Sequence, residues 1–249
     1  MTLIRGGWVI LAFHSLAAPW LVAQDASPVR VAGKLELHRV IDRELAPGQT
    51  DEYTVEVTAG QFVRLVARQL GVDVAVTVLD PQGKTVLEAD RENGAFGPEA
   101  ASFIGKTSGQ YRVRISNGSG PAGRYQMEFL ESREPTEADR SRIEAETVEF
   151  QAVRESQAGT REARLRSIEL YGRTASIWHR LNDAYEEGLC LYAIGSSYDD
   201  LGEKQKSLDY YGHALPIRRA VGDRSGEAIT LNDIGSVYDD LGERQKALD

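Results

Sequence analysis

Residues 194–203 have the sequence IGSSYDDLGE, and residues 234–243 have the sequence IGSVYDDLGE. The match continues downstream, because residues 205–206 and 245–246 are both Gln-Lys. A fainter match at the same spacing reaches back to Tyr171. A fixed period of 40 residues is typical of a solenoid made of repeated structural units. The sequence therefore predicts a repeat array in which a third, divergent unit precedes the two similar ones.

Each unit is expected to be a helical hairpin. Leu191, Ile194 and Tyr198 follow one another at spacings of three and four, which places them on one face of a helix. Gly195 lies on the same face and lets a second helix approach closely, and Gly202 ends the helix. A single hairpin cannot bury its apolar faces alone, so neighbouring units must stack.

The N-terminal half has a different periodicity, since apolar and polar residues alternate with period two. Turn sequences rich in proline and glycine separate the alternating segments. Many short strands over about 100 residues indicate a sandwich or barrel, and we expect a jelly-roll-like, all-β sandwich over residues 31–130. The predicted strands are residues 34–37, 53–57, 62–66, 72–79, 111–115 and 125–129.

The change from strands to helices is expected at residues 131–135, which we interpret as a linker. The all-α array then covers residues 136–249. Its units are predicted at 136–182, 184–222 and 224–249, and the last hairpin is expected to be truncated in its second helix, as in a fragment.

Residues 1–23 have the order of a secretory signal. Arg5 precedes an apolar run from Trp8 to Val22, and Ala23 offers a small residue for cleavage. The run is shorter than the roughly 20 apolar residues that a membrane-spanning helix needs. We therefore expect an exported protein, periplasmic or extracellular, with no membrane span after cleavage; the alternative is an uncleaved anchor.

The net charge of the chain is -9, with 29 basic and 38 acidic residues. A chain of this charge has no basic field to attract phosphates, so nucleic acid is not an expected partner. The single cysteine excludes an internal disulfide and any metal site that needs several cysteines.

The repeats resemble the tetratricopeptide repeat, which carries large, glycine, tyrosine and alanine residues at the positions of Leu191, Gly195, Tyr198 and Ala214. The resemblance covers residues 137–249. The 40-residue period is similar to that of kinesin light chains, and Ser207 departs from the family pattern, in which alanine is usual. The resemblance implies an all-α solenoid whose first helices line a concave groove that binds a peptide.

The N-terminal half resembles the bacterial pre-peptidase C-terminal domain, a secreted accessory domain. The similarity lies in the order of its turns, which are residues 47–53, 59–61, 80–83, 109–111 and 123–125. Similar bacterial chains with this domain order often continue into a caspase-like peptidase domain of the type named CHAT.

No complete active site is evident, and we predict that the chain is not an enzyme. A dyad of Cys190 and His179 needs the two side chains within hydrogen-bond reach, and a free cysteine near a packed helix face is more often buried. Asp73, Asp80 and Asp90 could recruit calcium, although turn chemistry explains Asp80. We therefore expect no cofactor, no metal site and no catalytic residue.

The resemblance implies a peptide-binding stripe on the first helix of each hairpin, one step round from the packing face. The residues are Tyr192, Ser196 and Asp199, then Asn232, Ser236 and Asp239. In similar arrays an asparagine at the position of Asn232 holds the backbone of a bound peptide, because an amide both donates and accepts. The alternative is a merely solvated helix face. The nearby aspartates favour a basic partner.

Two functions follow as hypotheses. The first is a scaffold that binds a protein or peptide through the concave groove, without catalysis. The second is the regulatory N-terminal fragment of a secreted, caspase-like CHAT peptidase whose catalytic domain is missing from this sequence. Carbohydrate binding by the sandwich has little support, because all three tryptophans, Trp8, Trp20 and Trp178, lie outside it.

Overall fold

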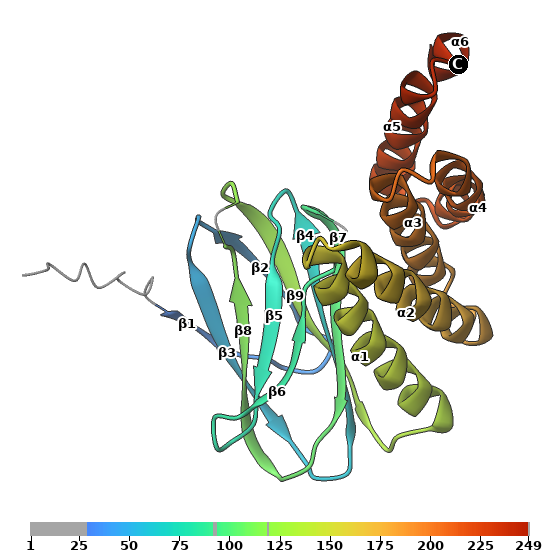
Figure 1. Ribbon diagram of the computed structural model, residues 1–249. Coiled ribbons are helices and arrows are strands. Elements are labelled where there is room, and N and C mark those ends of the chain that lie inside the picture. Colours follow the sequence, from blue (N-terminus) through green and yellow to red (C-terminus); the bar gives the residue numbers. More distant parts are fainter. Residues whose placement is uncertain (1–28, 92–93, 119, 249) are drawn as a thin grey trace, which may run out of the picture.

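The computed structural model describes residues 29–91, 94–118 and 120–248, so the predicted signal at 1–23 lies outside the described residues. The described chain forms nine strands and then six helices (Figure 1). This order confirms the predicted fold class, an all-β sandwich followed by an all-α array. Among the described helices, none has the length and apolar character that a membrane crossing requires.

The strands of the sandwich belong to two sheets, one of order β1-β3-β8-β5-β6 and one of order β2-β9-β4-β7. From β2 to β9 the chain changes sheet at nearly every connection, which is the strand order of a jelly roll. The ladders are antiparallel except that between β1 and β3. The strands are β1 Val29–Lys34, β2 Val40–Leu45, β3 Thr50–Val57, β4 Phe62–Leu70, β5 Ala75–Leu79, β6 Thr85–Ala89, β7 Phe96–Ile104, β8 Gly109–Ser116 and β9 Gly123–Arg133.

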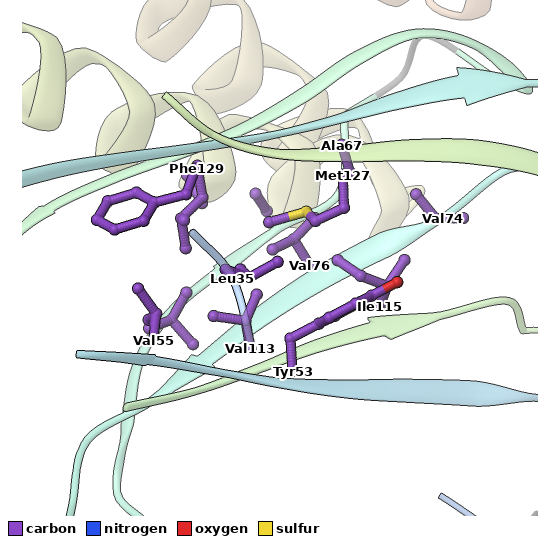
Figure 2. Close-up of a cluster of buried hydrophobic side chains, with 14 of the residues drawn as sticks. Leu35, Tyr53, Val55, Ala67, Val74, Val76, Val113, Ile115, Met127 and Phe129 are labelled. Atoms are coloured by element: carbon purple, nitrogen blue, oxygen red, sulfur yellow. The ribbon is translucent and has the colours of Figure 1, made fainter. Parts of the chain in front are cut away.

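The core of the sandwich lies between the sheets. In β8 the side chains of Tyr111, Val113 and Ile115 are buried, whereas Arg112 and Arg114 between them are partly exposed. Alternate side chains of a strand point to opposite faces, so this alternation places one row in the core. Figure 2 shows residues from both sheets meeting there, including Tyr53, Val55, Val76, Val113, Ile115, Met127 and Phe129.

Three strands, β2, β6 and β7, were not predicted, and each lies at the edge of a sheet. Edge strands tolerate charged residues, glycine and proline, because one side of the strand has no neighbour to pair with. Strand β2 contains the consecutive polar residues 42–44, and β7 contains Gly97 and Pro98. The alternation that reveals the inner strands is therefore weak in these three. The strand predicted at 34–37 is also misplaced, because β1 ends at Lys34.

The connection between sandwich and helices differs from the predicted linker at 131–135. Strand β9 continues to Arg133, which pairs with Phe62 of β4. The guanidinium of Arg133 donates to the carboxylate of Asp139 at 2.5 and 2.9 Å, and Thr136 and Asp139 form a capping box at the start of α1. The connection is thus only residues 134–136, and hydrogen bonds bridge it.

The helices pair in chain order as the hairpins α1–α2, α3–α4 and α5–α6 (Figure 1). The second and third hairpins keep the 40-residue register, because α3 and α5 begin at residues 184 and 224 and α4 and α6 at residues 204 and 244. The helices are α1 Glu137–Gln157, α2 Arg161–Arg180, α3 Ala184–Asp200, α4 Lys204–Val221, α5 Arg224–Asp240 and α6 Arg244–Leu248. Gly202 and Gly242 end α3 and α5 with positive φ angles of 74° and 75°, which glycine adopts without strain.

Gly195 is the point of close approach within the second hairpin, as the sequence predicts. A β-carbon at this position would lie 2.6 Å from Cδ1 and 2.8 Å from Cε1 of Tyr211 on α4. Tyr211 is itself buried. The aromatic ring therefore packs directly on the backbone of α3.

Replacing Gly195 with alanine is expected to lower the free energy of unfolding by about 1–3 kcal/mol, because Tyr211 must move. The matched control is Gly212→Ala on α4, where nothing lies within 4 Å of the new β-carbon. That substitution is expected to raise the free energy of unfolding by about 0.5–1 kcal/mol, because alanine loses less backbone entropy. Urea unfolding measures the stability change of both variants, and equal changes would contradict the close approach of Tyr211 to α3.

Candidate functional site

Tyr192 on α3 is half-buried between two neighbouring helices. Its ring stacks on Tyr211 of α4 with centroids 5.4 Å apart, and the guanidinium carbon of Arg218 lies 4.3 Å from its centroid. Its hydroxyl donates to Oδ2 of Asp233 on α5 at 2.7 Å. Burial, together with the bond to Asp233, raises the pKa of Tyr192, so its hydroxyl remains a donor. The side chain therefore joins α3 to α5 next to Asn232.

Asp199 of the predicted stripe is linked to Asp240 of the next repeat, a neighbour of the stripe residue Asp239, by a lysine that sequence analysis missed. Asp199 accepts from Nζ of Lys204 at 2.7 Å, and the same ammonium donates to Asp240 at 2.5 Å. The two bonds raise the pKa of Lys204, which remains charged. Lys204 thus bridges two successive repeats, and Ser196 lies half-buried on the same helix as Asp199.

The second predicted stripe, on α5, is open to solvent. Asn232, Ser236 and Asp239 are exposed, and they line a hollow of about 560 Å³. The amide Nδ2 of Asn232 donates to Asp233 at 3.3 Å, the same aspartate that holds Tyr192. The remaining lining residues are Leu231, Gly235, Arg244 and Ala247.

The 40-residue register relates the residues that line this hollow to those of the preceding repeat. Gly235 and Ser236 occupy the positions of Gly195 and Ser196 in the preceding repeat. At Gly195 the space in front of the helix is filled by Tyr211. In the preceding repeat, the surface of α3 that corresponds to this part of α5 is therefore covered by an aromatic ring.

Cys190 and His179 do not form a dyad. Cys190 is fully buried, and burial raises the pKa of its thiol well above the usual value, which disfavours the nucleophilic thiolate. The side chain of His179 is 75% exposed and contacts Glu187 at 3.1 Å. The cysteine is therefore a core residue of the array.

The aspartates considered for calcium have other surroundings. Oδ1 of Asp80 accepts from the backbone N–H groups of Gln82 and Lys84 at 3.0 and 2.8 Å, which is turn chemistry. Burial raises the pKa values of Asp73 and Asp90. Within the described ranges, no group of three or more histidine, cysteine, aspartate and glutamate side chains could hold a metal ion.

A buried ionic cluster joins the sandwich to the helices, and sequence analysis missed it. Arg91, between β6 and β7, lies 3.5 Å from carboxylate oxygens of Glu99 on β7, Glu149 on α1 and Glu186 on α3. All four side chains are 6% exposed or less. Nη1 of Arg91 also donates to the carbonyl of Ala100 at 2.9 Å. We call these four charged residues the junction cluster.

A second contact at the junction covers the free edge of β7. The carboxylate of Glu146 on α1 accepts from the backbone N–H of Ser102 at 2.8 Å and from its hydroxyl at 2.9 Å. An unpaired strand edge is open to pairing with other chains unless something blocks it. Helix α1 therefore protects this edge and is fixed in register on the sandwich.

Comparisons of the sequence with models of protein families and with curated proteins find no match. Among solved structures, the pre-peptidase C-terminal domain of a collagenase from Bacillus anthracis is 20% identical over 41% of this chain and 94% of that domain, with a TM-score of 0.33. The TPR domain of Arabidopsis FLU is 18% identical over 40% of this chain and 87% of that domain, with a TM-score of 0.35. A periplasmic lysozyme inhibitor from Aeromonas hydrophila is 14% identical over 40% of this chain and 96% of its own length, with a TM-score of 0.32.

Proposed function

We propose that the protein is an exported, non-enzymatic scaffold whose helical array binds a peptide segment of a partner protein. The observation that carries the proposal is the exposed row of Asn232, Ser236 and Asp239 along the hollow on α5. Tyr192 and Asp233 adjoin this row and fix α3 beside α5 through a 2.7 Å hydrogen bond. The surface therefore combines exposed polar groups with a rigid support.

The chemistry of this surface favours an extended, basic segment. The Asn232 amide can donate to a peptide carbonyl and accept from a peptide N–H at once. Asp239 is 68% exposed at its side chain, and Arg244 lies 3.9 Å away, so the ion pair between them is loose.

The double substitution of Asn232 and Ser236 with alanine is expected to weaken such binding about tenfold, because each loses a hydrogen bond to the peptide. A library of synthetic peptides that vary in net charge provides the ligands, and fluorescence anisotropy measures Kd. The controls are Gln205→Ala, an exposed amide on α4, and Ser176→Ala, an exposed hydroxyl on α2.

The controls are expected to bind as the unsubstituted chain does. Unchanged Kd in the double variant, or a preference of the unsubstituted chain for acidic peptides, would show that the site lies elsewhere.

The second hypothesis, a regulatory part of a secreted CHAT peptidase, rests on the family resemblance, and sequencing the gene downstream of codon 249 tests it.

A further inference from the structure

A cleft of about 570 Å³ lies at the junction, away from the peptide surface of α5. Its walls come from β6, β7 and α1. Strands β6 and β7 are the last strands of the two sheets, so the sandwich is open on this side, and α1 packs against both strands (Figure 1). Ligand sites are common at such boundaries between domains, and this volume lies in their usual range.

The body of the cleft is apolar. Phe103 and Tyr111 are buried side chains of the sandwich, and Leu87 of β6 is half-buried beside them. Ile143 and Phe150, half-buried on α1, line the cleft from the helix. Phe103 and Tyr111 stack on each other with ring centroids 5.5 Å apart, so the half-buried Phe150 is the ring that a flat apolar group can contact.

Three buried polar residues line the cleft, Arg91, Ser102 and Glu149, and Glu149 is the carboxyl group among them. Its side chain is 5% exposed, and its Oε2 accepts no hydrogen bond from the described part of the chain. The positive charge facing Glu149 is Arg91, which also pairs with Glu99 and Glu186. The negative charge of Glu146 acts on Glu149 as well. Burial and these carboxylates raise the pKa of Glu149 to about 8, despite Arg91.

When all three carboxyl groups are ionised, the charges at this end of the cleft do not balance. Three carboxyl groups contact one guanidinium, and Nε of Arg91 lacks a hydrogen-bond acceptor among the described residues. An ionised Glu149 that shares Arg91 with two other carboxyl groups is costly in this buried site, and a further cation at hydrogen-bond distance reduces that cost. Lys84 and Lys106 also line the cleft, but both are exposed.

We propose that the junction cleft binds an organic cation with an apolar body, an ammonium or guanidinium group on a hydrophobic stem, whose charged group pairs with Glu149. This site is separate from the peptide surface proposed above. When the cation binds to the protonated form, the carboxyl O–H bond of Glu149 breaks and the proton passes to solvent. The products are a carboxylate and the cation hydrogen-bonded to it.

Three ligands with the same body test the proposal: 4-phenylbutylammonium, 4-phenylbutan-1-ol and 4-phenylbutanoate. Isothermal titration calorimetry at pH 7 is expected to show the ammonium binding roughly tenfold more tightly than the alcohol, because a charge-assisted hydrogen bond exceeds a neutral one. Titrations in buffers of different ionisation enthalpy are expected to show proton release for the ammonium alone. Equal binding of ammonium and alcohol, or tightest binding of the carboxylate at Lys84 and Lys106, would overturn the proposal.

Two variants locate the site. Glu149→Gln keeps the shape of the protonated side chain, and it is expected to reduce ammonium binding to the level of the alcohol and to abolish proton release. The matched control is Glu144→Gln, which removes an exposed carboxylate of the same helix. It is expected to change neither ammonium binding nor proton release. Ile143→Trp narrows the cleft and is expected to weaken the ammonium and the alcohol alike. Unchanged binding in Ile143→Trp would place the ligand elsewhere and refute the site.

Discussion

Replacing Arg91 with methionine is expected to lower the free energy of unfolding by about 3–5 kcal/mol at pH 8, because it leaves buried carboxyl groups without their cation. Methionine keeps most of the length of the arginine side chain, so the loss of stability reports mainly on the removal of its charge. The effect is expected to shrink at pH 5, where protonation neutralises the carboxyl group of Glu149, whose pKa burial raises to about 8. Burial also raises the pKa of Glu186, which acts in the same direction. Urea unfolding at the two pH values measures the difference.

The control is Arg39→Met, which removes an exposed arginine that pairs with Glu36 at 3.0 Å. Exposed pairs contribute about 0–1 kcal/mol, so this variant is expected to resemble the unsubstituted chain at both pH values. If Arg91→Met loses no more stability than Arg39→Met, the junction cluster does not hold the sandwich and the helices together.

The stability of the chain is expected to fall as pH rises from about 5 to 9. The pKa of Glu149 is raised to about 8 in the folded chain from an ordinary value of 4.5, so the folded state holds a proton that the unfolded state releases. The stabilisation is full below pH 4.5 and is lost as pH rises through about 8, by on the order of 3–5 kcal/mol. Glu186 acts in the same direction, because burial raises its pKa too.

The variant Glu149→Gln isolates this effect, because glutamine cannot ionise. Its stability is expected to depend less on pH, and above pH 8 it is expected to exceed that of the unsubstituted chain. Chemical unfolding followed by circular dichroism between pH 5 and 9 gives both curves. A Glu149→Gln curve parallel to that of the unsubstituted chain would show that Glu149 does not hold the proton.

The repeat array could be predicted from sequence because its signals are local. The helix caps and the spacing of apolar residues lie within one hairpin, and they recur 40 residues later in the next, as Gly195 recurs at Gly235. The inner strands were also predictable, because a strand such as β8 is buried on one face and alternates. The edge strands β2 and β6 were missed because most of their residues are at least partly exposed. Strand β7 was missed because residues 99–103 are buried on both faces, so apolar and polar residues do not alternate there.

The junction cluster could not be predicted, because its members are brought together by folding from two different domains. Arg91 and Glu99 come from the sandwich, and Glu149 and Glu186 come from two helices. The sequence nevertheless contained one indication of a buried charge. Glu149 stands four residues after Ala145 and three before Ala152, both of which are buried, so it occupies the apolar face of α1. A glutamate at such a position indicates a buried partner, although it does not identify that partner.

The hydrogen bond between Glu146 and the N–H of Ser102 can form only late in the synthesis of the chain. The two residues are 44 positions apart, and Glu146 comes later. A nascent chain that ends at Arg133 holds every described strand but lacks the helix that covers β7. Until α1 is in place, the newly made sandwich exposes a strand edge to its neighbours, so early contact with other nascent chains favours aggregation.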